Sequence, residues 1–141
     1  MPPISTNKSA MLSDKDYRTL ASVRAELRSF AHFTEKMTSA AGLTPQQHQI
    51  LLALRAADGC ALTIGQIAEA MFLKPHSASG MADRLQAMGL VERVRDQQDR
   101  RSIRLRLTER SHAILDSLGQ AHRDELRRIR PLLISLLSQL E

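Results

Sequence analysis

The sequence predicts a mainly α-helical protein with one small β-hairpin, and three observations carry this prediction. Apolar residues recur at spacings of three and four along most of the chain. Two Thr-x-x-Gln motifs, which are typical of helix capping boxes, precede such stretches. The spacing changes to two only over residues 90–107, as expected for paired strands. With 141 residues, 43% of them hydrophobic, the chain is long enough to bury one core.

The N-terminal segment predicts a flexible arm and one long helix. Residues 1–12 contain two prolines and no apolar period, so we expect a loosely attached arm. Ser13 is placed to cap a helix whose first turn contains Asp14 and Asp16. Apolar side chains then recur at helical spacing until Gly42, where we expect the helix to end.

The central part of the chain predicts three further helices, over residues 45–57, 64–71 and 75–88. Thr44 and Thr63 each stand three residues before a glutamine, which predicts capping boxes at the first two starts. Pro75 suits the first turn of the third helix, and Gly89 is the glycine expected just beyond its end.

The remaining third of the chain predicts a β-hairpin and a helical C-terminal region. Residues 90–95 and 103–107 alternate between two faces, and the polar stretch between them forms the predicted tip. Thr108 caps the helix that follows, which we expect Pro131 to break or kink. A last, leucine-rich helix is predicted after that proline.

Residues 63–85 combine a short helix, a brief turn and a second helix, which predicts a helix-turn-helix. Apolar residues fall where two steeply crossing helices need contacts: Ile67, Ala68, Met71, Leu73, Ala78 and Met81. The second helix of this motif enters the major groove of DNA with its N-terminal residues at the base edges. In this chain those residues are His76, Ser77, Ser79 and Gly80.

The charge distribution favours a polyanionic partner. The net charge is +5, and residues 74–110 hold nine Lys or Arg against five Asp or Glu, which is most of the excess. The predicted hairpin tip contains Asp99-Arg100-Arg101, and arginines extended in this way fit a narrow minor groove. We expect Asp99 to accept a hydrogen bond that holds the Arg101 guanidinium extended. A solvated, flexible turn is the alternative.

The run from Leu43 to Thr108 resembles the MarR (multiple-antibiotic-resistance regulator) family of winged-helix repressors. The matching segments are LTPQQHQILLAL, TIGQIAEAM, DRLQAMGLVERVRD and DQQDRRSIRLRLT. The resemblance implies a winged helix-turn-helix lobe at residues 43–108 within a single domain, residues 13–141. It also implies a homodimer held by N- and C-terminal dimerisation helices, residues 13–42 and 109–141. Its implied partner is palindromic double-stranded DNA, from which a small organic molecule often releases such proteins.

The resemblance places DNA contacts on His76, Ser77, Ser79, Gly80, Arg84, Asp99 and Arg101. We add Lys74, Arg95 and Arg100 from the same basic run. Many members carry arginine or another long polar side chain where this chain has Gly80. We therefore expect His76 or the wing to carry more of the sequence specificity.

The family's effector cleft lies between the dimerisation helices and the DNA-binding lobe, which makes Arg28, Phe30, Phe33, Met37 and His48 the candidate ligand-binding residues. Three of these side chains share one helix face. They would suit a small aromatic or phenolic acid, with His48 or Arg28 near its carboxylate. The alternative is that this face belongs to the core.

Other functional classes find little support in the sequence. Neither a Gly-x-Ser-x-Gly motif nor a phosphate-binding glycine-rich loop occurs, so we expect no enzyme. The five histidines and Cys60 form no metal-ligand cluster, so no metal or cofactor is expected. No basic residue stands near Cys60 in sequence to favour its thiolate, which indicates a structural cysteine.

The expected compartment is the cytoplasm, because the sequence contains no pattern typical of a signal peptide or a membrane span. Two rival functions stay open at this point. The chain could be a constitutive DNA-binding regulator without an effector, or a winged-helix module that binds another protein.

Overall fold

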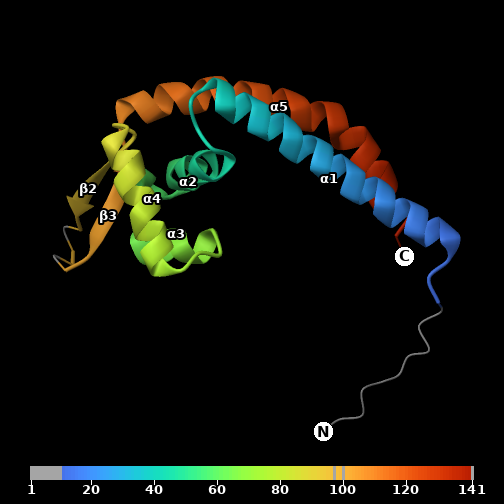
Figure 1. Ribbon diagram of the computed structural model, residues 1–141, viewed down its shortest axis with the longest axis horizontal. Helices are drawn as coiled ribbons and strands as arrows, with labels where there is room; N and C mark the ends of the chain where they lie inside the picture. The colour runs from blue at the N-terminus through green and yellow to red at the C-terminus, as the bar shows by residue number, and fades with distance from the viewer. Residues whose placement is uncertain (1–10, 97, 100, 141) are drawn as a thin grey trace, which may run out of the picture. The chain divides into compact units, whose positions relative to one another are not determined.

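The computed structural model describes residues 11–96, 98–99 and 101–140. Its elements are, in order, α1 (Asp14–Ala40), α2 (Pro45–Ala56), the 3-10 turn η1 (Asp58–Cys60), β1 (Ala61–Thr63), α3 (Ile64–Ala70), α4 (Pro75–Ala87), β2 (Val91–Arg95), β3 (Ile103–Leu107) and α5 (Glu109–Leu137) (Figure 1). The mainly helical class and the small β-wing are therefore confirmed. The predicted arm lies outside the described residues except for Met11 and Leu12, which form no regular element.

The predicted helix starts are confirmed by their hydrogen bonds. Thr44 Oγ1 accepts from the N–H of Gln47 at 3.1 Å, and the Gln47 side chain accepts from the N–H of Thr44 at 3.0 Å. Thr63 and Gln66 form the same reciprocal pair at 3.1 and 2.9 Å. These bonds satisfy backbone donors that a helix start leaves unpaired, so α2 and α3 begin at fixed residues.

The sheet contains one more strand than predicted. The hairpin of β2 and β3 is present, but β1 also pairs with β3, which gives the antiparallel order β1-β3-β2. Leu62 of β1 and Arg93 of β2 both lie opposite Leu105 of β3. Three residues are too few to display an alternating pattern, and for this reason the sequence hides β1.

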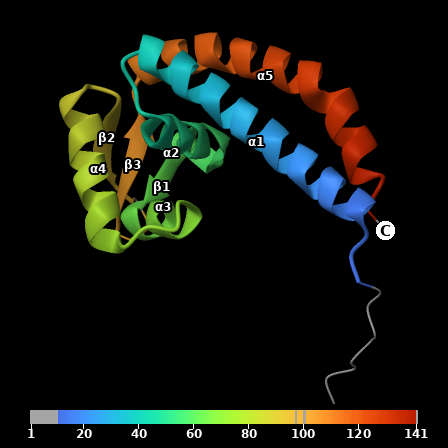
Figure 2. The same ribbon diagram turned by 45° about the vertical axis from the view of Figure 1, so that its right-hand side comes forward.

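The described chain divides into two compact units, and Phe33–Arg123 form one of them. This unit contains the helix-turn-helix and the wing, with the strands beside α3 and α4 (Figure 2). Its buried apolar core includes Ile50, Leu51, Leu54, Ile67, Leu85, Leu90 and Leu105, each no more than 1% exposed. Burial of these side chains fixes α3 and α4 against the sheet.

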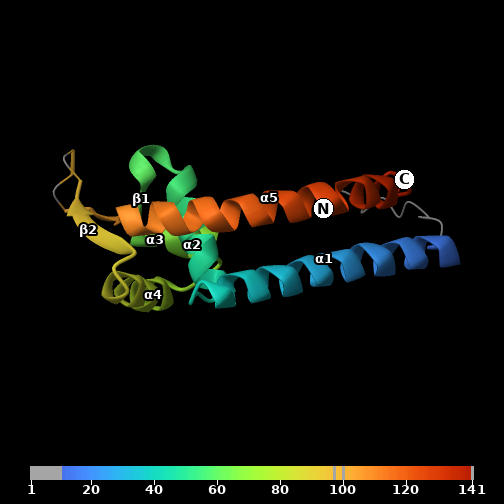
Figure 3. The ribbon, with the colours of Figure 1, turned by 90° about the horizontal axis from the view of Figure 1, so that it is seen from above.

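The other unit consists of the chain up to His32 and from Asp124 onward. Figure 3 shows its two helical segments, the blue end of α1 and the red end of α5. The Thr19 hydroxyl donates to the Gln139 side-chain oxygen at 3.4 Å across them. No helix in the described part of the chain is both long and apolar enough to cross a membrane.

The prediction of a separate last helix after Pro131 is wrong, because α5 continues through this residue to Leu137. Proline removes one backbone hydrogen bond, but bonds in the turns before and after it can keep a helix continuous. The leucines after Pro131 therefore belong to the same helix as Leu115 and Leu118.

Candidate nucleic-acid interface

Helix α4 has one face anchored in the core and the opposite face exposed. Ala78, Ala82 and Leu85 are at most 2% exposed, and α3 contributes the buried Ile67 and Ala68 beside them. Small alanines at this crossing allow the two helices to approach closely, as a helix-turn-helix requires. The motif predicted at residues 63–85 is thus formed.

The exposed face of α4 carries the side chains predicted to meet DNA. His76, Ser77, Gly80 and Arg84 are exposed, and Ser79 is half-buried. A Cβ atom added at Gly80 would meet nothing within 4 Å, so packing within the chain does not require glycine there. Lys74 is the N-cap residue but makes no side-chain capping bond. The first-turn amides of α4 are therefore available to an anion at the positive end of the helix.

Side chains at and just before the start of α5 hold the C-terminal end of α4, a contact that sequence reasoning missed. Arg110 donates to the carbonyl of Met88 at 2.7 Å, and Thr108 donates to the carbonyl of Gly89 at 2.8 Å. The buried Ser111 hydroxyl donates to the carbonyl of Leu90. These bonds satisfy carbonyls at and just beyond the end of α4, so they fix that end of the helix to the start of α5.

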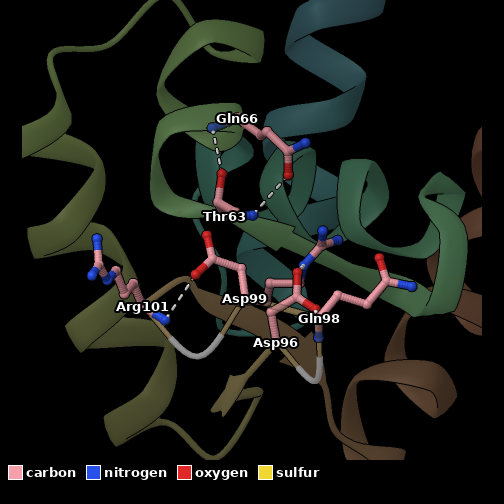
Figure 4. Close-up of polar contacts among 7 residues, drawn as sticks. Thr63, Gln66, Asp96, Gln98, Asp99 and Arg101 are labelled. Atoms are coloured by element: carbon pink, nitrogen blue, oxygen red, sulfur yellow. Dashed lines mark hydrogen bonds and ion pairs between the residues drawn. The ribbon is translucent and has the colours of Figure 1, made fainter.

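The wing turn is held by two aspartates that each accept a backbone N–H two residues ahead (Figure 4). Asp96 accepts from Gln98 and Asp99 accepts from Arg101, both at 3.0 Å. Such turns are a preferred conformation of aspartate in loops. Arg104 also donates to Asp96 at 3.0 Å, which ties the turn to β3.

The expected role of Asp99 requires a correction. Its carboxylate holds the backbone of Arg101, and the Arg101 guanidinium extends away from it in Figure 4. Asp99 accepts from the backbone N–H of Arg101 rather than from its guanidinium, because that N–H is within reach without ordering a long side chain. Asp99 therefore shapes the turn from which Arg101 projects. Arg100 lies outside the described residues.

The Asp96 carboxyl is stabilised in its charged form. The backbone N–H of Gln98 lowers its pKa most, desolvation opposes this effect, and the hydrogen bond from Arg104 lowers the pKa further. A carboxylate that accepts several hydrogen bonds stays ionised at neutral pH. Asp96 therefore keeps its contacts in the wing turn under ordinary conditions.

The described basic residues of α4, with its N-cap, and of the wing fall into two groups. Arg93, Arg104 and Arg106 pair with Asp83, Asp96 and Glu92 at 2.6, 3.0 and 2.5 Å. The other group has no ion-pair partner among the residues that the structure describes, and it comprises Lys74, Arg84, Arg95 and Arg101. All four are exposed and all four belong to the predicted DNA-binding set. Their charges are available to phosphate groups.

The predicted ligand-binding residues are divided between the two units. Arg28 is exposed and Phe30 half-buried in the unit that contains the chain up to His32. Phe33 and Met37 are half-buried in the other unit, where Met37 packs against the core. His48 is buried there, with 1% exposure, and its Nδ1 has no hydrogen-bond partner among the described residues.

His48 of α2 lies beside His122 of α5, and their separation of 74 positions hides this pairing in the sequence. Their ring centroids are 5.5 Å apart with an interplanar angle of 47°. Burial lowers the pKa of His48 first and the proximity of His122 lowers it second. Burial also lowers the pKa of His122. Both imidazoles are therefore neutral above mildly acidic pH.

This pair predicts a loss of stability on acidification. A histidine in the unfolded chain has a pKa near 6.5, whereas both folded values are lower. The unfolded state therefore takes up protons first, and the free energy of unfolding should fall as pH drops below about 6.5. Each histidine can reduce the folding equilibrium constant by at most about tenfold per pH unit. Urea titrations between neutral and mildly acidic pH measure this slope.

The control for that measurement uses two matched histidine variants. His122→Gln should flatten the pH slope, because it removes one proton-binding group and relieves His48 of a neighbouring charge. His32→Gln changes an exposed histidine of α1 and should leave the slope unchanged. Equal slopes in the parent chain and in His122→Gln would contradict the assignment.

Cys60 does have a basic neighbour, contrary to the expectation from sequence. Arg55 lies five residues earlier, and its guanidinium donates to the Cys60 sulfur at 3.9 Å. The η1 turn folds the chain back toward the end of α2, which brings the two side chains together. Among the described residues, no three His, Cys, Asp or Glu side chains gather as a metal site would require.

Three comparisons with known proteins agree on one family. The model of the MarR family matches residues 41–102. The HTH-type transcriptional repressor MdtR of Bacillus subtilis (strain 168) is 40% identical over 68 residues, which are 48% of this chain and 43% of MdtR. This match therefore spans less than half of the repressor's length.

Solved structures extend the likeness beyond the winged lobe. AbsC, a MarR family transcriptional regulator from Streptomyces coelicolor, superposes with a TM-score of 0.71 at 25% identity, over 83% of this chain and 79% of AbsC. Sco3205 from the same organism, solved in complex with DNA, gives a TM-score of 0.69 at 19% identity, over 83% of this chain and 74% of Sco3205. The second likeness shows the shared fold.

Proposed function

We propose that the chain is a transcriptional regulator of the MarR type that binds double-stranded DNA sequence-specifically, because the family model, the curated relatives and the solved structures all point to that family. It acts as a repressor on palindromic operators in the cytoplasm and catalyses no reaction. MdtR is a transcriptional repressor, and Sco3205 has been solved with DNA, which supports both parts of the proposal.

One observation within the chain carries the proposal furthest. Four basic residues of α4 and the wing have no ion-pair partner among the described residues, and they lie at the N-terminus of α4, on its exposed face and in the wing. Cations without partners meet phosphates at little desolvation cost, and the wing arginine suits the minor groove. His76, Ser77 and Ser79 then supply hydrogen-bonding groups for base edges.

We further infer a homodimer, because a palindrome presents two equal half-sites to two lobes. The unit built from both chain ends exposes large apolar side chains, which include Leu20, Leu27, Leu126, Leu132, Ile134 and Leu137, at 40 to 56%. An isologous interface would cover such side chains.

Selection of bound duplexes from a random pool tests this function. The expected product is an enriched inverted repeat whose half-site centres lie about one helical turn, or 10 base pairs, apart. Enrichment of no sequence, together with capture of a protein by the same lobe, would favour a protein-interaction module instead. A single unrepeated half-site would contradict the dimeric mode of binding.

We propose that a small aromatic or phenolic acid weakens DNA binding. Support comes from His48, whose buried Nδ1 lacks a partner among the described residues, and from Phe33 and Met37, which are half-buried in the same unit. A ligand that prefers the DNA-free state must bind the DNA complex less tightly, by reciprocity. Arg28 and Phe30 are further candidates for the same ligand.

The ligand hypothesis is tested with benzoate and hydroxybenzoates against the complex with the selected duplex. We expect release of DNA at millimolar ligand and a higher Tm of the free protein. If no compound releases DNA and none shifts the Tm, the chain is a constitutive regulator.

A further inference from the structure

Three helices of this chain end in the same backbone motif, and one of them breaks the residue preference of that motif. In each case the residue after the C-cap donates its N–H to the carbonyl three residues earlier. The next residue donates its N–H to the carbonyl five residues earlier. At the ends of α1 and α4 the first of these positions is Gly42 and Gly89, with φ of 77° and 73°. At the end of α3 it is Phe72, with φ of 54°.

Phenylalanine is energetically unfavourable at this position. The left-handed backbone conformation is unfavourable for residues with a Cβ atom. A bulky residue with such a positive φ is a genuine outlier. Its hydrogen bonds to Glu69, and those of Leu73 to Ala68, are the ones that glycine makes elsewhere in the chain, so the turn itself does not require an aromatic ring. Strain of this kind indicates a functional constraint when nothing in the fold explains it.

Burial does not explain the ring either, because Phe72 is 98% exposed. Met71, the residue before it, packs against the core of the lobe, and Leu73, the residue after it, is half-buried. The ring therefore makes no contribution to the core, while the backbone that presents it is held in place. An exposed large apolar side chain on a fixed backbone favours a contact with another molecule.

The position of the ring identifies the partner. Phe72 lies in the turn between the two helices of the helix-turn-helix, two residues before Lys74 and four before His76 at the start of α4. In this motif the first helix crosses the DNA backbone and the second enters the major groove, so the turn between them lies at the groove edge. Lys74, two residues further along the chain, has no ion-pair partner among the described residues, and an unpaired cation this near in sequence fits a polyanionic partner better than an apolar protein surface.

We propose that Phe72 packs on the apolar surface that double-stranded DNA presents at the edge of the major groove. That surface consists of thymine methyl groups and deoxyribose carbons, and phenylalanine is among the side chains that contact the thymine methyl. Stacking on unpaired bases plays no part in this contact. The inference rests on the proposed DNA-binding function and adds to it an apolar determinant beside the charged ones.

The test compares three variants of the full chain on the duplex selected by the parent. Phe72→Gly and Phe72→Asn suit the left-handed backbone, so their Tm should rise by about 2–5 °C. Both remove the ring, so their affinity should fall roughly tenfold. Phe72→Leu keeps an apolar side chain and the strain, so its affinity should stay within about threefold of the parent.

Opposite changes in stability and affinity are a result that a purely structural residue would not give. Replacement of single thymines by deoxyuridine in the duplex then separates the two apolar sources. A thymine whose methyl matters to the parent but not to Phe72→Asn identifies a methyl contact, and the absence of such a thymine identifies a deoxyribose contact.

The outcomes that overturn the proposal are distinct from failure of the proposed function. If both Phe72→Gly and Phe72→Asn bind the duplex as tightly as the parent, Phe72 does not contact DNA, although the chain still binds it. A lower Tm together with lower affinity makes Phe72 a structural residue. If the parent chain binds no duplex at all, the proposed function fails and this inference fails with it.

Discussion

Deletion of residues 132–141 is expected to convert the dimer into monomers and to lower affinity for the selected duplex by about two orders of magnitude or more. The deleted segment contains Leu132, Ile134 and Leu137, which are 44 to 56% exposed in the single chain. Loss of this apolar surface removes the driving force for association. A single lobe then binds one half-site without the gain from a linked second lobe. Light scattering and titration of labelled duplex measure both effects.

Two point variants test whether the loss of dimerisation and affinity comes from unfolding. Ile134→Asp places a charge on a side chain that is 56% exposed, so it should reduce dimerisation without disturbing the fold of the chain. Ser135→Asp, one residue further on an exposed position of the same helix, should leave the dimer intact. A monomeric variant that still binds the duplex as tightly as the parent would falsify the dimer proposal.

Replacement of Arg101 by alanine should weaken specific binding by about 1–3 kcal/mol per site, with stability unchanged within about 0.5 kcal/mol. The residue is exposed, and its guanidinium has no ion-pair partner in the described part of the chain. Its removal therefore costs a contact with DNA and little else. Fluorescence anisotropy with the selected duplex measures the affinity, and urea unfolding measures the stability.

Arg106→Ala is the matched control, because it removes the same charge from the neighbouring strand. Arg106 pairs with Glu92 at 2.5 Å and is therefore already neutralised, so we expect a smaller loss of affinity. Equal losses in the two variants would indicate a general effect of net charge. Parental affinity in Arg101→Ala and in Arg100→Ala alike would show that the wing does not contact DNA.

The elements that the sequence predicts well are those with local signals. Thr44 and Thr63 mark helix starts because their hydrogen bonds span only three residues. Gly89 marks a helix end because its φ of 73° suits glycine. By contrast, β1 depends on pairing with a strand more than 40 positions later, and a three-residue strand has no periodicity of its own.

The candidate site divides along the same line. The exposed cations of α4 and the wing follow from residue type and position within a motif, and the sequence predicts all four that lack partners. The direction of the Asp99 hydrogen bond depends on turn geometry, and the proximity of Arg55 to Cys60 depends on how η1 reverses the chain. Nothing in the sequence distinguishes Phe72 from other apolar residues, because its role depends on its positive φ and its exposure together.

The salt dependence of binding to the selected duplex tests the central claim most directly. If the unpaired cations of α4 and the wing meet phosphates, each releases a counterion, and eight such cations in a dimer predict that log affinity falls against log salt concentration with a slope of about −7. Removal of Arg84 and Arg95 together should make this slope shallower by about 3 to 4. An affinity that stays constant between about 50 and 200 mM salt would contradict the account, because no protein can bind duplex DNA through its phosphates without this dependence.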